Sequence, residues 1–149
     1  MASFPDGCTL LFGGSGGIGS GVARTFAEAG SDVALIYRSQ PGPASEAAGY
    51  ARSLGRKATV HAADVTDAAQ VRAAIDATIA AHGRIHSVVW GAGPLVNQRY
   101  LAETPMDEWH HAFAVEVHGL FTAIGMIVPH MRDHGGGSFV RSEERRVGK

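Results

Sequence analysis

Short apolar runs alternate with amphipathic stretches along this chain. The runs carry few charges and are bounded by glycine, proline or polar residues, which is typical of buried strands. They predict four strands, at residues 10–12, 31–37, 57–62 and 85–90. Because helical patterns separate the strands, we expect one α/β domain, a parallel sheet with helices on both of its faces.

Two of the amphipathic stretches have clear ends. The first helix carries Val22 and Phe26 at helical spacing from Ile18 and ends at Gly30. Thr66 or Asp67 caps a later helix that stops at Gly83. The apolar face of that later helix carries Val71, Ile75, Thr78, Ile79 and His82.

The other two helical stretches are less regular. Pro41-Gly42-Pro43 is expected to break the chain, so that Ser45 caps a helix that extends to about Leu54. Residues 107 to about 134 predict one long helix with a wide apolar stripe. The stripe consists of Trp109, Phe113, Val117, Leu120, Phe121, Ile124, Ile127, Val128 and Met131.

A glycine-rich loop joins the first strand to the first helix. Gly13 can let the chain turn sharply, Gly17 can let the backbone approach a pyrophosphate, and Gly19 can let the helix pack closely. Amide groups at the start of the helix then face the phosphates. No Gly-Lys-Ser/Thr follows the loop, which disfavours a nucleoside triphosphatase.

Composition narrows the classes of partner and compartment. A net charge of −1 gives no electrostatic argument for nucleic acid or an anionic membrane. We expect no run long enough to span a bilayer and no signal peptide, which predicts a soluble cytoplasmic protein. The single Cys8 is expected to be a small buried residue, and the histidines of the long helix do not complete a metal site.

The loop and four later motifs together resemble the short-chain dehydrogenase/reductase family, whose first turn reads Thr-Gly-x-x-x-Gly-Ile-Gly. Here Gly13 to Gly19 provide that turn. The later matches are Asp64-Val65 after the third strand, Gly91-Ala92-Gly93 after the fourth, Gly119 and Phe121 in the long helix, and Gly136 to Val140 at the start of a fifth strand.

The resemblance implies a Rossmann-like doubly wound sheet in the order 3-2-1-4-5, truncated after the fifth strand begins. A dinucleotide would lie where the strand order reverses, between strands 1 and 4. It also implies homo-oligomers in the intact parent, through the long helix. The cofactor-binding residues that it implies are Gly13, Ser15, Gly16, Gly17, Ile18, Gly19, Arg38, Ser39, Asp64, Val65, Gly91, Ala92 and Gly93.

The residues after the second strand bear on the choice of nicotinamide cofactor. An acidic side chain there would bind the ribose hydroxyls of NAD and repel a 2′-phosphate. This chain has Arg38 and Ser39 instead, and the next carboxylate along the sequence is Glu46. A guanidinium and a hydroxyl suit a 2′-phosphate, so NADP is predicted over NAD. The alternative is a solvated surface arginine.

The family's catalytic pair is absent. Its tyrosine exchanges a proton with the substrate, and a lysine four residues later lowers the pKa of that tyrosine. The tyrosines at 37, 50 and 100 are followed at that spacing by Pro41, Leu54 and Thr104. We therefore predict no catalytic residue in this chain. The intact parent would interconvert a carbonyl and an alcohol, and the alternative is a non-catalytic NADP-binding or sensing module.

Three positions depart from the family pattern inside the matching region. Phe12 replaces a threonine and Trp90-Gly91 replaces an Asn-Asn pair, so an apolar contact is expected between the ends of strands 1 and 4. Glu116 occupies the place of an asparagine that supports a proton relay. A carboxylate cannot donate as an amide does, which leaves an alternative proton carrier or a different chemistry open.

The last nine residues break the apolar pattern of the expected fifth strand. Residues 141–149 read Arg-Ser-Glu-Glu-Arg-Arg-Val-Gly-Lys, which matches the translation of a widely used sequencing-library adapter. We therefore expect residues 1–140 to be an incomplete dinucleotide-binding domain and residues 141–149 to be non-native. The alternative is a charged, solvated tail. Without the elements that would cover Phe113, Leu120 and Ile124, poor folding is expected.

Overall fold

The strands form one five-stranded parallel sheet in a computed structural model that describes residues 4–94 and 100–141. Its order is β3-β2-β1-β4-β5, as predicted. The strands are β1 (Cys8–Phe12), β2 (Asp32–Tyr37), β3 (Ala58–Ala62), β4 (Ile85–Trp90) and β5 (Ser138–Arg141). The helical segments are α1 (Gly17–Glu28), α2 (Pro41–Ser53), α3 (Ala68–His82), η1 (Leu101–Glu103), α4 (Met106–Phe113), η2 (Ala114–Gly119) and α5 (Leu120–Asp133).

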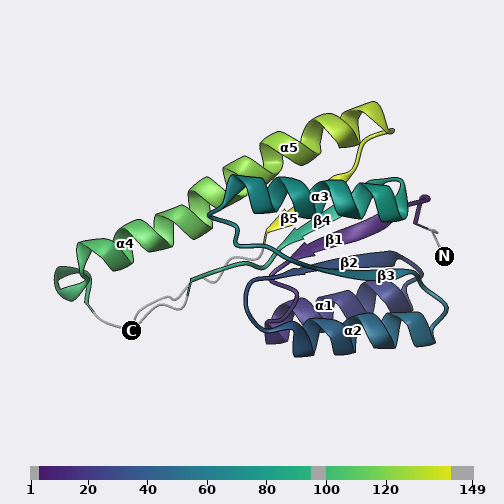
Figure 1. Cartoon of the computed structure of the whole chain (residues 1–149), viewed down its shortest axis with the longest axis horizontal. Helices are drawn as coiled ribbons and strands as arrows, with labels where there is room; N and C mark the ends of the chain where they lie inside the picture. The colour runs from purple at the N-terminus through teal and green to yellow at the C-terminus, as the bar shows by residue number, and fades with distance from the viewer. Residues whose placement is uncertain (1–3, 95–99, 142–149) are drawn as a thin grey trace, which may run out of the picture.

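The helices cover both faces of the sheet, because right-handed crossovers place successive helices according to the direction in which the strand order runs. Helices α1 and α2 lie on one face, and α3 and α5 lie on the other (Figure 1). Alternate residues of β1 accordingly enter different cores: Leu10 and Phe12 pack toward α3 and α5, whereas Leu11 packs toward α1 and α2. The central strands β1, β2 and β4 are therefore largely buried, whereas most of the edge strand β5 is exposed.

Of the two helix starts for which a capping residue was predicted, one is confirmed and the other is wrong. Asp67 is the N-cap of α3, and its carboxylate accepts hydrogen bonds from the amides of Ala69 and Gln70, as one of the two expected caps. The expected cap at Ser45 is wrong. Helix α2 already begins at Pro41. Proline has no amide hydrogen, and in the first helical turn that hydrogen would have no partner within the helix, so proline is favourable there.

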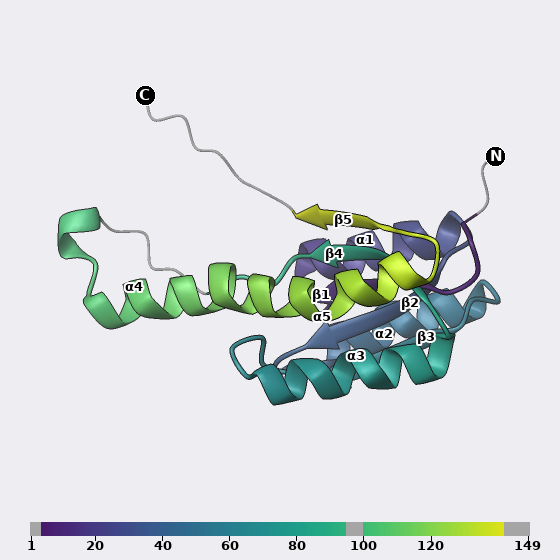
Figure 2. The ribbon, with the colours of Figure 1, turned by 90° about the horizontal axis from the view of Figure 1, so that it is seen from above.

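The long C-terminal helix is continuous from Met106 to Asp133 but changes its winding in the middle. The segment η2 is π-helical, and Gly119 at its end passes so close to Val65 that an added β-carbon would lie 2.8 Å from the Val65 carbonyl oxygen. The helix therefore crosses directly over the loop that follows β3. Figures 1 and 2 show α4 projecting past the sheet while α5 packs on it.

This helix corrects the expectation that no segment is long and apolar enough to span a bilayer. By length and composition alone it qualifies, with a mean hydropathy of 1.6 over its most apolar window. Its expected stripe also divides: Ile127 and Met131 are buried, whereas Trp109, Phe113 and Phe121 are exposed. The apolar side chains therefore face two directions, one toward the sheet and one toward solvent.

The fifth strand extends to the first residue of the expected non-native tail. Arg141 lies opposite Trp90 in the β4–β5 register, and its guanidinium contacts Glu116. Residues 142–149 lie outside the described part of the chain, so the origin of the tail stays a prediction.

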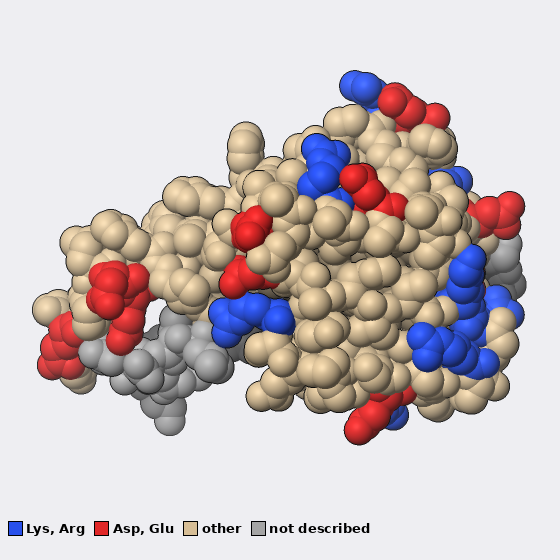
Figure 3. Space-filling view, in the orientation of Figure 1, with Lys and Arg blue, Asp and Glu red and all other residues tan. Residues whose placement is uncertain are grey.

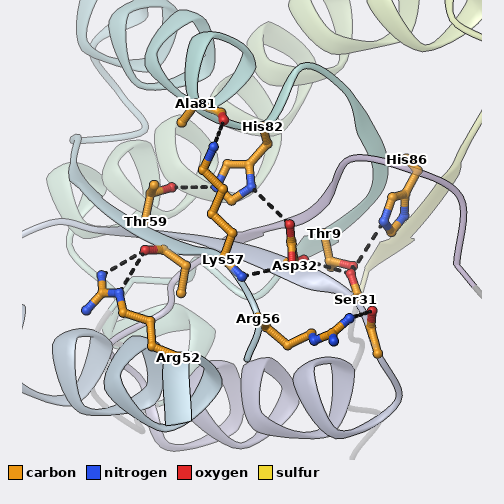
Figure 4. A network of polar contacts seen from close by, with 12 residues as sticks. Thr9, Ser31, Asp32, Arg52, Arg56, Lys57, Thr59, Ala81, His82 and His86 are labelled. Atoms are coloured by element: carbon orange, nitrogen blue, oxygen red, sulfur yellow. Dashed lines mark hydrogen bonds and ion pairs between the residues drawn. The ribbon is translucent and has the colours of Figure 1, made fainter. Parts of the chain in front are cut away.

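A polar network lies at the amino ends of the strands (Figure 4). The glycine loop lies at their carboxyl ends, on the opposite side of the molecule. Asp32 accepts a hydrogen bond from the Lys57 amide at 2.9 Å, and His82 bonds to the Thr59 hydroxyl at 3.0 Å. Arg52 also donates to the carbonyl of Ala58. These bonds tie the edge strand β3 to the helices on both faces of the sheet.

Candidate functional site

Two adjoining pockets lie at the carboxyl ends of the strands, where parallel α/β sheets bind their ligands. The first, called the glycine-loop pocket, has a volume of about 230 Å³. Its walls come from the loops after four strands: the loop after β1, the turn after β2, the segment after β3 and the turn after β4. It is lined by Gly13, Ser15, Gly16, Ile36, Tyr37, Arg38, Ser39, Gln40, Ala63, Asp64, Val65, Gly91, Ala92, Gly93 and Val115.

Three glycines of the loop perform different structural tasks. Gly13 has a positive φ of 79°, which only glycine adopts readily, and so provides the sharp turn out of β1. A β-carbon on Gly19 would lie 2.2 Å from the Gly13 carbonyl oxygen, which shows how tightly the helix packs on its own loop. A β-carbon on Gly17 would meet nothing within 4 Å, so the backbone there borders open space.

The positive end of α1 has no acidic side chain or side-chain cap to compensate it. Its N-cap, Gly16, supplies no side-chain hydrogen bond, and its first turn has no acidic residue. The first amides of a helix have no partner within the helix, and the helix dipole makes this end positive. Because Gly16 lines the glycine-loop pocket, the loop fits a bound phosphate or pyrophosphate.

A second positive group enters the same pocket from the turn after β2. Arg38 and Ser39 are both exposed there, beside Asp64. Thr66 donates two hydrogen bonds to one oxygen of Asp64, at 2.9 Å from its amide and 2.7 Å from its hydroxyl. These bonds, with a smaller contribution from the charge of Arg38, hold the pKa of Asp64 below its ordinary value of 3.8.

This carboxylate qualifies the argument from sequence about Arg38. The next acidic residue along the sequence is Glu46, but in space Asp64 is close enough to Arg38 to interact with it electrostatically. Asp64 therefore offsets part of the positive charge that a phosphate would meet. The sequence did not reveal this proximity because the two residues follow different strands of the sheet.

The second pocket, called the helix pocket, lies against α4 and η2 and has a volume of about 700 Å³. It shares the turn formed by Gly91, Ala92 and Gly93 with the glycine-loop pocket, so an extended ligand can occupy both. Most of its remaining walls are apolar. It is lined by Ile18, Trp90, Gly91, Ala92, Gly93, Pro94, Ala112, Phe113, Glu116, Val117 and Arg141.

The charged groups of the helix pocket form an ion pair. The guanidinium of Arg141 lies 2.7 Å from Oε2 of Glu116, and both side chains are partly exposed. The other carboxylate oxygen, Oε1, lies 3.2 Å from where a β-carbon of Gly93 would be. Glycine at position 93 therefore leaves room beside this oxygen.

The expected apolar contact between strands 1 and 4 is present. The rings of Phe12 and Trp90 pack with their centroids 4.7 Å apart, and both residues are almost fully buried. The indole N–H of Trp90 has no hydrogen-bond partner among the described residues. The site thus carries hydrophobic packing directly beneath the glycine turn after β4.

The structure brings most of the predicted cofactor residues to one place. Ten of the thirteen line the glycine-loop pocket, Ile18 lines the helix pocket, and Gly17 and Gly19 line neither. Residues that the sequence did not single out are Ile36, Tyr37, Gln40, Ala63 and Val115. Tyr37, Gln40 and Ala63 adjoin predicted residues along the chain, and Ile36 lies two positions before Arg38, so these four could have been found that way. Val115 comes from the distant helix.

The described residues show no group of three or more histidine, cysteine, aspartate or glutamate side chains placed to hold a metal ion. His130 and His134 do stack, with ring centroids 4.2 Å apart. Cys8 is fully buried at the start of β1, and burial raises the pKa of its thiol to about 12. Neither feature belongs to the two pockets.

The motifs and the fold can now be compared with known proteins. A family model described as "Enoyl-(Acyl carrier protein) reductase" matches residues 13–143, from the glycine loop to the end of the sheet. The chain belongs to the short-chain dehydrogenase/reductase family. This confirms the resemblance drawn from the glycine loop and the later motifs.

Individual relatives support the same assignment. D-threitol dehydrogenase of Mycolicibacterium smegmatis is 32% identical over 134 residues, which is 88% of this chain and 50% of that protein. A short-chain type dehydrogenase/reductase from Mycobacterium ulcerans superimposes with a TM-score of 0.85 at 31% identity, over 94% of this chain and 52% of that one. The chain thus spans about half the length of the curated relatives that it matches.

A third relative has a stated cofactor. The NADPH-dependent 3-quinuclidinone reductase of Rhodotorula rubra has a TM-score of 0.84 and 34% identity, over 93% of this chain and 52% of that one. These similarities extend over the part of this chain that contains the glycine loop and the sheet described above.

Proposed function

We propose that this chain is the dinucleotide-binding half of an NADP-dependent oxidoreductase that interconverts a carbonyl and an alcohol. One observation carries the proposal. Residues of the glycine loop together with residues 38–39, 64–65 and 91–93 are scattered along the sequence but line two pockets that share one glycine turn. The loop residues concerned are Gly13, Ser15, Gly16 and Ile18. Family membership supports the reaction class, and the NADPH-dependent relative supports the cofactor.

The proposed roles follow from the chemistry of the donors. The uncapped start of α1 would hold the pyrophosphate, and Gly17 would let the backbone approach it. Arg38 and Ser39 would bind the 2′-phosphate, because a guanidinium forms charge-assisted hydrogen bonds with phosphate oxygens. When bound, NADP would supply the hydride acceptor, and the helix pocket would hold the alcohol or ketone.

Calorimetric titrations of the chain with NADPH and with NADH test the cofactor assignment. We expect NADPH to bind at least about tenfold more tightly, since one charge-assisted contact distinguishes the two. Arg38→Ala should remove most of that difference. Arg72→Ala, which removes an exposed arginine from α3, is the matched control and should leave it unchanged. Equal affinity of the unsubstituted chain for both cofactors would contradict the NADP assignment.

A second candidate is a non-catalytic NADP-binding or sensing module. The absence of a Tyr-x-x-x-Lys sequence from this chain favours it. The assay for catalysis mixes small ketones with the protein while NADPH is bound and follows the absorbance of the reduced nicotinamide. Binding without oxidation of NADPH is expected of this chain under both proposals, so the assay decides between them when it is run on a protein that spans the full length of the relatives.

A further inference from the structure

Four polar side chains form a continuous row that starts at the amino end of β2 and runs along β3, in the order Asp32, His82, Thr59 and His61. Nε2 of His82 lies 3.0 Å from the Thr59 hydroxyl oxygen, and Nε2 of His61 lies 3.1 Å from the same oxygen. Nδ1 of His82 lies 4.0 Å from Oδ2 of Asp32 (Figure 4). The row thus links β2, α3 and β3, and none of its members lines the glycine-loop pocket or the helix pocket.

The carboxylate at one end of the row selects a tautomer of His82. The His82 side chain is completely buried, and its Nδ1 has no hydrogen-bond partner among the described residues. Oδ2 of Asp32 faces this nitrogen, while Oδ1 accepts a hydrogen bond from the Lys57 amide at 2.9 Å. A carboxylate attracts an N–H group and repels a nitrogen lone pair, so the hydrogen of neutral His82 is favoured on Nδ1. Nε2 of His82 then carries no hydrogen and can only accept.

This choice passes along the row because each group has a fixed number of hydrogens to donate. Nε2 of His82 accepts, so the Thr59 hydroxyl donates its only hydrogen to it. The Thr59 oxygen is left as an acceptor, so its bond with His61 requires a hydrogen on Nε2 of His61. All the hydrogens of the row therefore point toward Asp32.

Protonation of His82 reverses the middle of the row. The added proton, taken from solvent, lies on Nε2 and faces Thr59, so the hydroxyl accepts there and turns its own hydrogen away. The other side-chain nitrogen bonded to this hydroxyl is Nε2 of His61. It accepts only after its hydrogen has been released to solvent and another has been taken up at Nδ1. One proton is bound overall, and His61 changes tautomer.

The groups that act on His82 determine when this happens. They are Asp32 on β2, Lys57 before β3 and His61 on β3. Asp32 favours the protonated ring, whereas burial, the largest influence, and the charges of Lys57 and His61 hold the pKa of His82 below its ordinary value of 6.5. The row therefore has its hydrogens directed toward Asp32 at neutral pH, and acid reverses it.

We propose that Asp32, His82, Thr59 and His61 form a pH-sensitive hydrogen-bond relay, whose direction is set by Asp32 and reverses when His82 is protonated. The relay ends at the half-buried ring of His61, three residues before Asp64 of the glycine-loop pocket. Acidity sensed at a fully buried imidazole is thus converted into a change of tautomer on the strand that leads into that pocket. The relay uses no residue of the proposed cofactor site, so it stands whether or not the chain binds NADP.

Nuclear magnetic resonance of the ring nitrogens of the whole chain reads the tautomers directly, because nitrogens with and without a hydrogen differ in chemical shift. At about pH 7.5 we expect neutral His82 to carry its hydrogen on Nδ1, by at least about tenfold over the other tautomer, and His61 to carry its hydrogen on Nε2. On acidification His61 should change to Nδ1–H in step with the protonation of His82. A hydrogen on Nε2 of neutral His82 overturns the direction of the relay, and an unchanged His61 overturns its reversal.

Asp32→Asn should reverse the relay without acid. The Lys57 amide needs an acceptor, so the amide oxygen of the new side chain takes the place of Oδ1 and its NH₂ group takes the place of Oδ2. A donor then faces Nδ1 of His82, which moves the hydrogen of His82 to Nε2 and that of His61 to Nδ1 at about pH 7.5. Asp76→Asn, at an exposed position of α3, is the matched control and should change neither ring.

Variants of Thr59 test whether the hydroxyl carries the change. In a Thr59→Val background, Asp32→Asn should no longer affect the tautomer of His61, because valine has the same shape without the hydroxyl. In a Thr59→Ser background the effect should return. A response of His61 that persists with valine overturns the role of Thr59. If Asp32→Asn abolishes the native circular dichroism, the tautomers and the acid titration of the wild-type chain still decide the proposal.

Discussion

Gly19 and Gly13 lie in such close contact that a β-carbon on Gly19 would be only 2.2 Å from the carbonyl oxygen of Gly13. The contact joins the first turn of α1 to the residue that turns the chain out of β1, where φ is 79°. Both partners are main-chain groups, so neither can move aside as a flexible side chain would. The loop therefore depends on the missing side chain at position 19 as well as on the positive φ at position 13.

Gly19→Ala should consequently destabilise the fold. Overpacking a rigid contact costs about 1–3 kcal/mol, and here the overlap is with backbone, so the upper part of that range is expected. Urea unfolding followed by circular dichroism measures the loss. Gly21→Ala is the matched control: it lies in the same helix with nothing within 4 Å of the added carbon. It should raise stability by about 0.5–1 kcal/mol, as alanine does in a helix. Equal effects at the two positions would contradict this account of the loop.

Gly17→Ala should separate stability from cofactor binding. The added methyl group meets no protein atom within 4 Å and lies at the start of α1, so the free energy of unfolding should rise by up to about 1 kcal/mol. The same methyl group would occupy the space through which the proposed pyrophosphate approaches the backbone. Calorimetric titration with NADPH should therefore show weaker binding by a more stable protein. Unchanged affinity would place the phosphates elsewhere.

Particular residues show how far the sequence could predict this structure. The strand order and the cap at Asp67 were predicted because they depend on local patterns and on a family resemblance that spans most of the chain. The start of α2 was misplaced because Pro41 and Pro43 serve as helix breakers in one context and as favourable first-turn residues in another. Local sequence does not decide between these.

The site was predicted less completely than the fold, for a different physical reason. Arg38 and Asp64 follow neighbouring strands, and their electrostatic interaction depends on the exact length of two turns. Likewise, Glu116 lies in the π-helical segment η2 and contacts Arg141 of β5 and the turn at Gly93, which are far from it along the chain. A change of winding of this kind often marks functional sites and has no simple sequence signature. Contacts between distant elements therefore had to come from the structure.

Cys8 should be inert in the folded protein despite being the only thiol. It is fully buried, and burial raises the pKa of its thiol to about 12, so almost no thiolate forms near neutral pH. Iodoacetamide at about pH 8 should leave the native chain unmodified, because the thiolate is the nucleophile. Adding urea should start the reaction in parallel with the loss of circular dichroism. Rapid labelling without urea would mean that β1 opens locally.

Acidification should destabilise the protein below about neutral pH, through four buried or half-buried imidazoles. Burial lowers the pKa of His61, His82, His86 and His130 from the ordinary 6.5. The unfolded chain therefore binds more protons than the folded one as the pH falls through 6.5, and the free energy of unfolding decreases. Asp64 and Asp67 act differently. Their pKa values lie below 3.8, so the stability they provide is retained in this window and lost only at lower pH.

His82 offers the sharpest test of this pH dependence. Its side chain is fully buried and bonds to Thr59 at 3.0 Å; Asp32, Lys57 and His61 are the charged or titratable groups that act on it. Asp32 favours the protonated form, but desolvation outweighs it, which is why the pKa of His82 falls. Urea midpoints at about pH 7.5 and about pH 5.5 should differ less in His82→Gln than in the wild-type chain, since one proton-linked group is gone. His118→Gln, at an exposed position of η2, should leave the difference unchanged. A wild-type midpoint that rises on acidification would show that protonated His82 is the form that the fold prefers, with Asp32 as its partner.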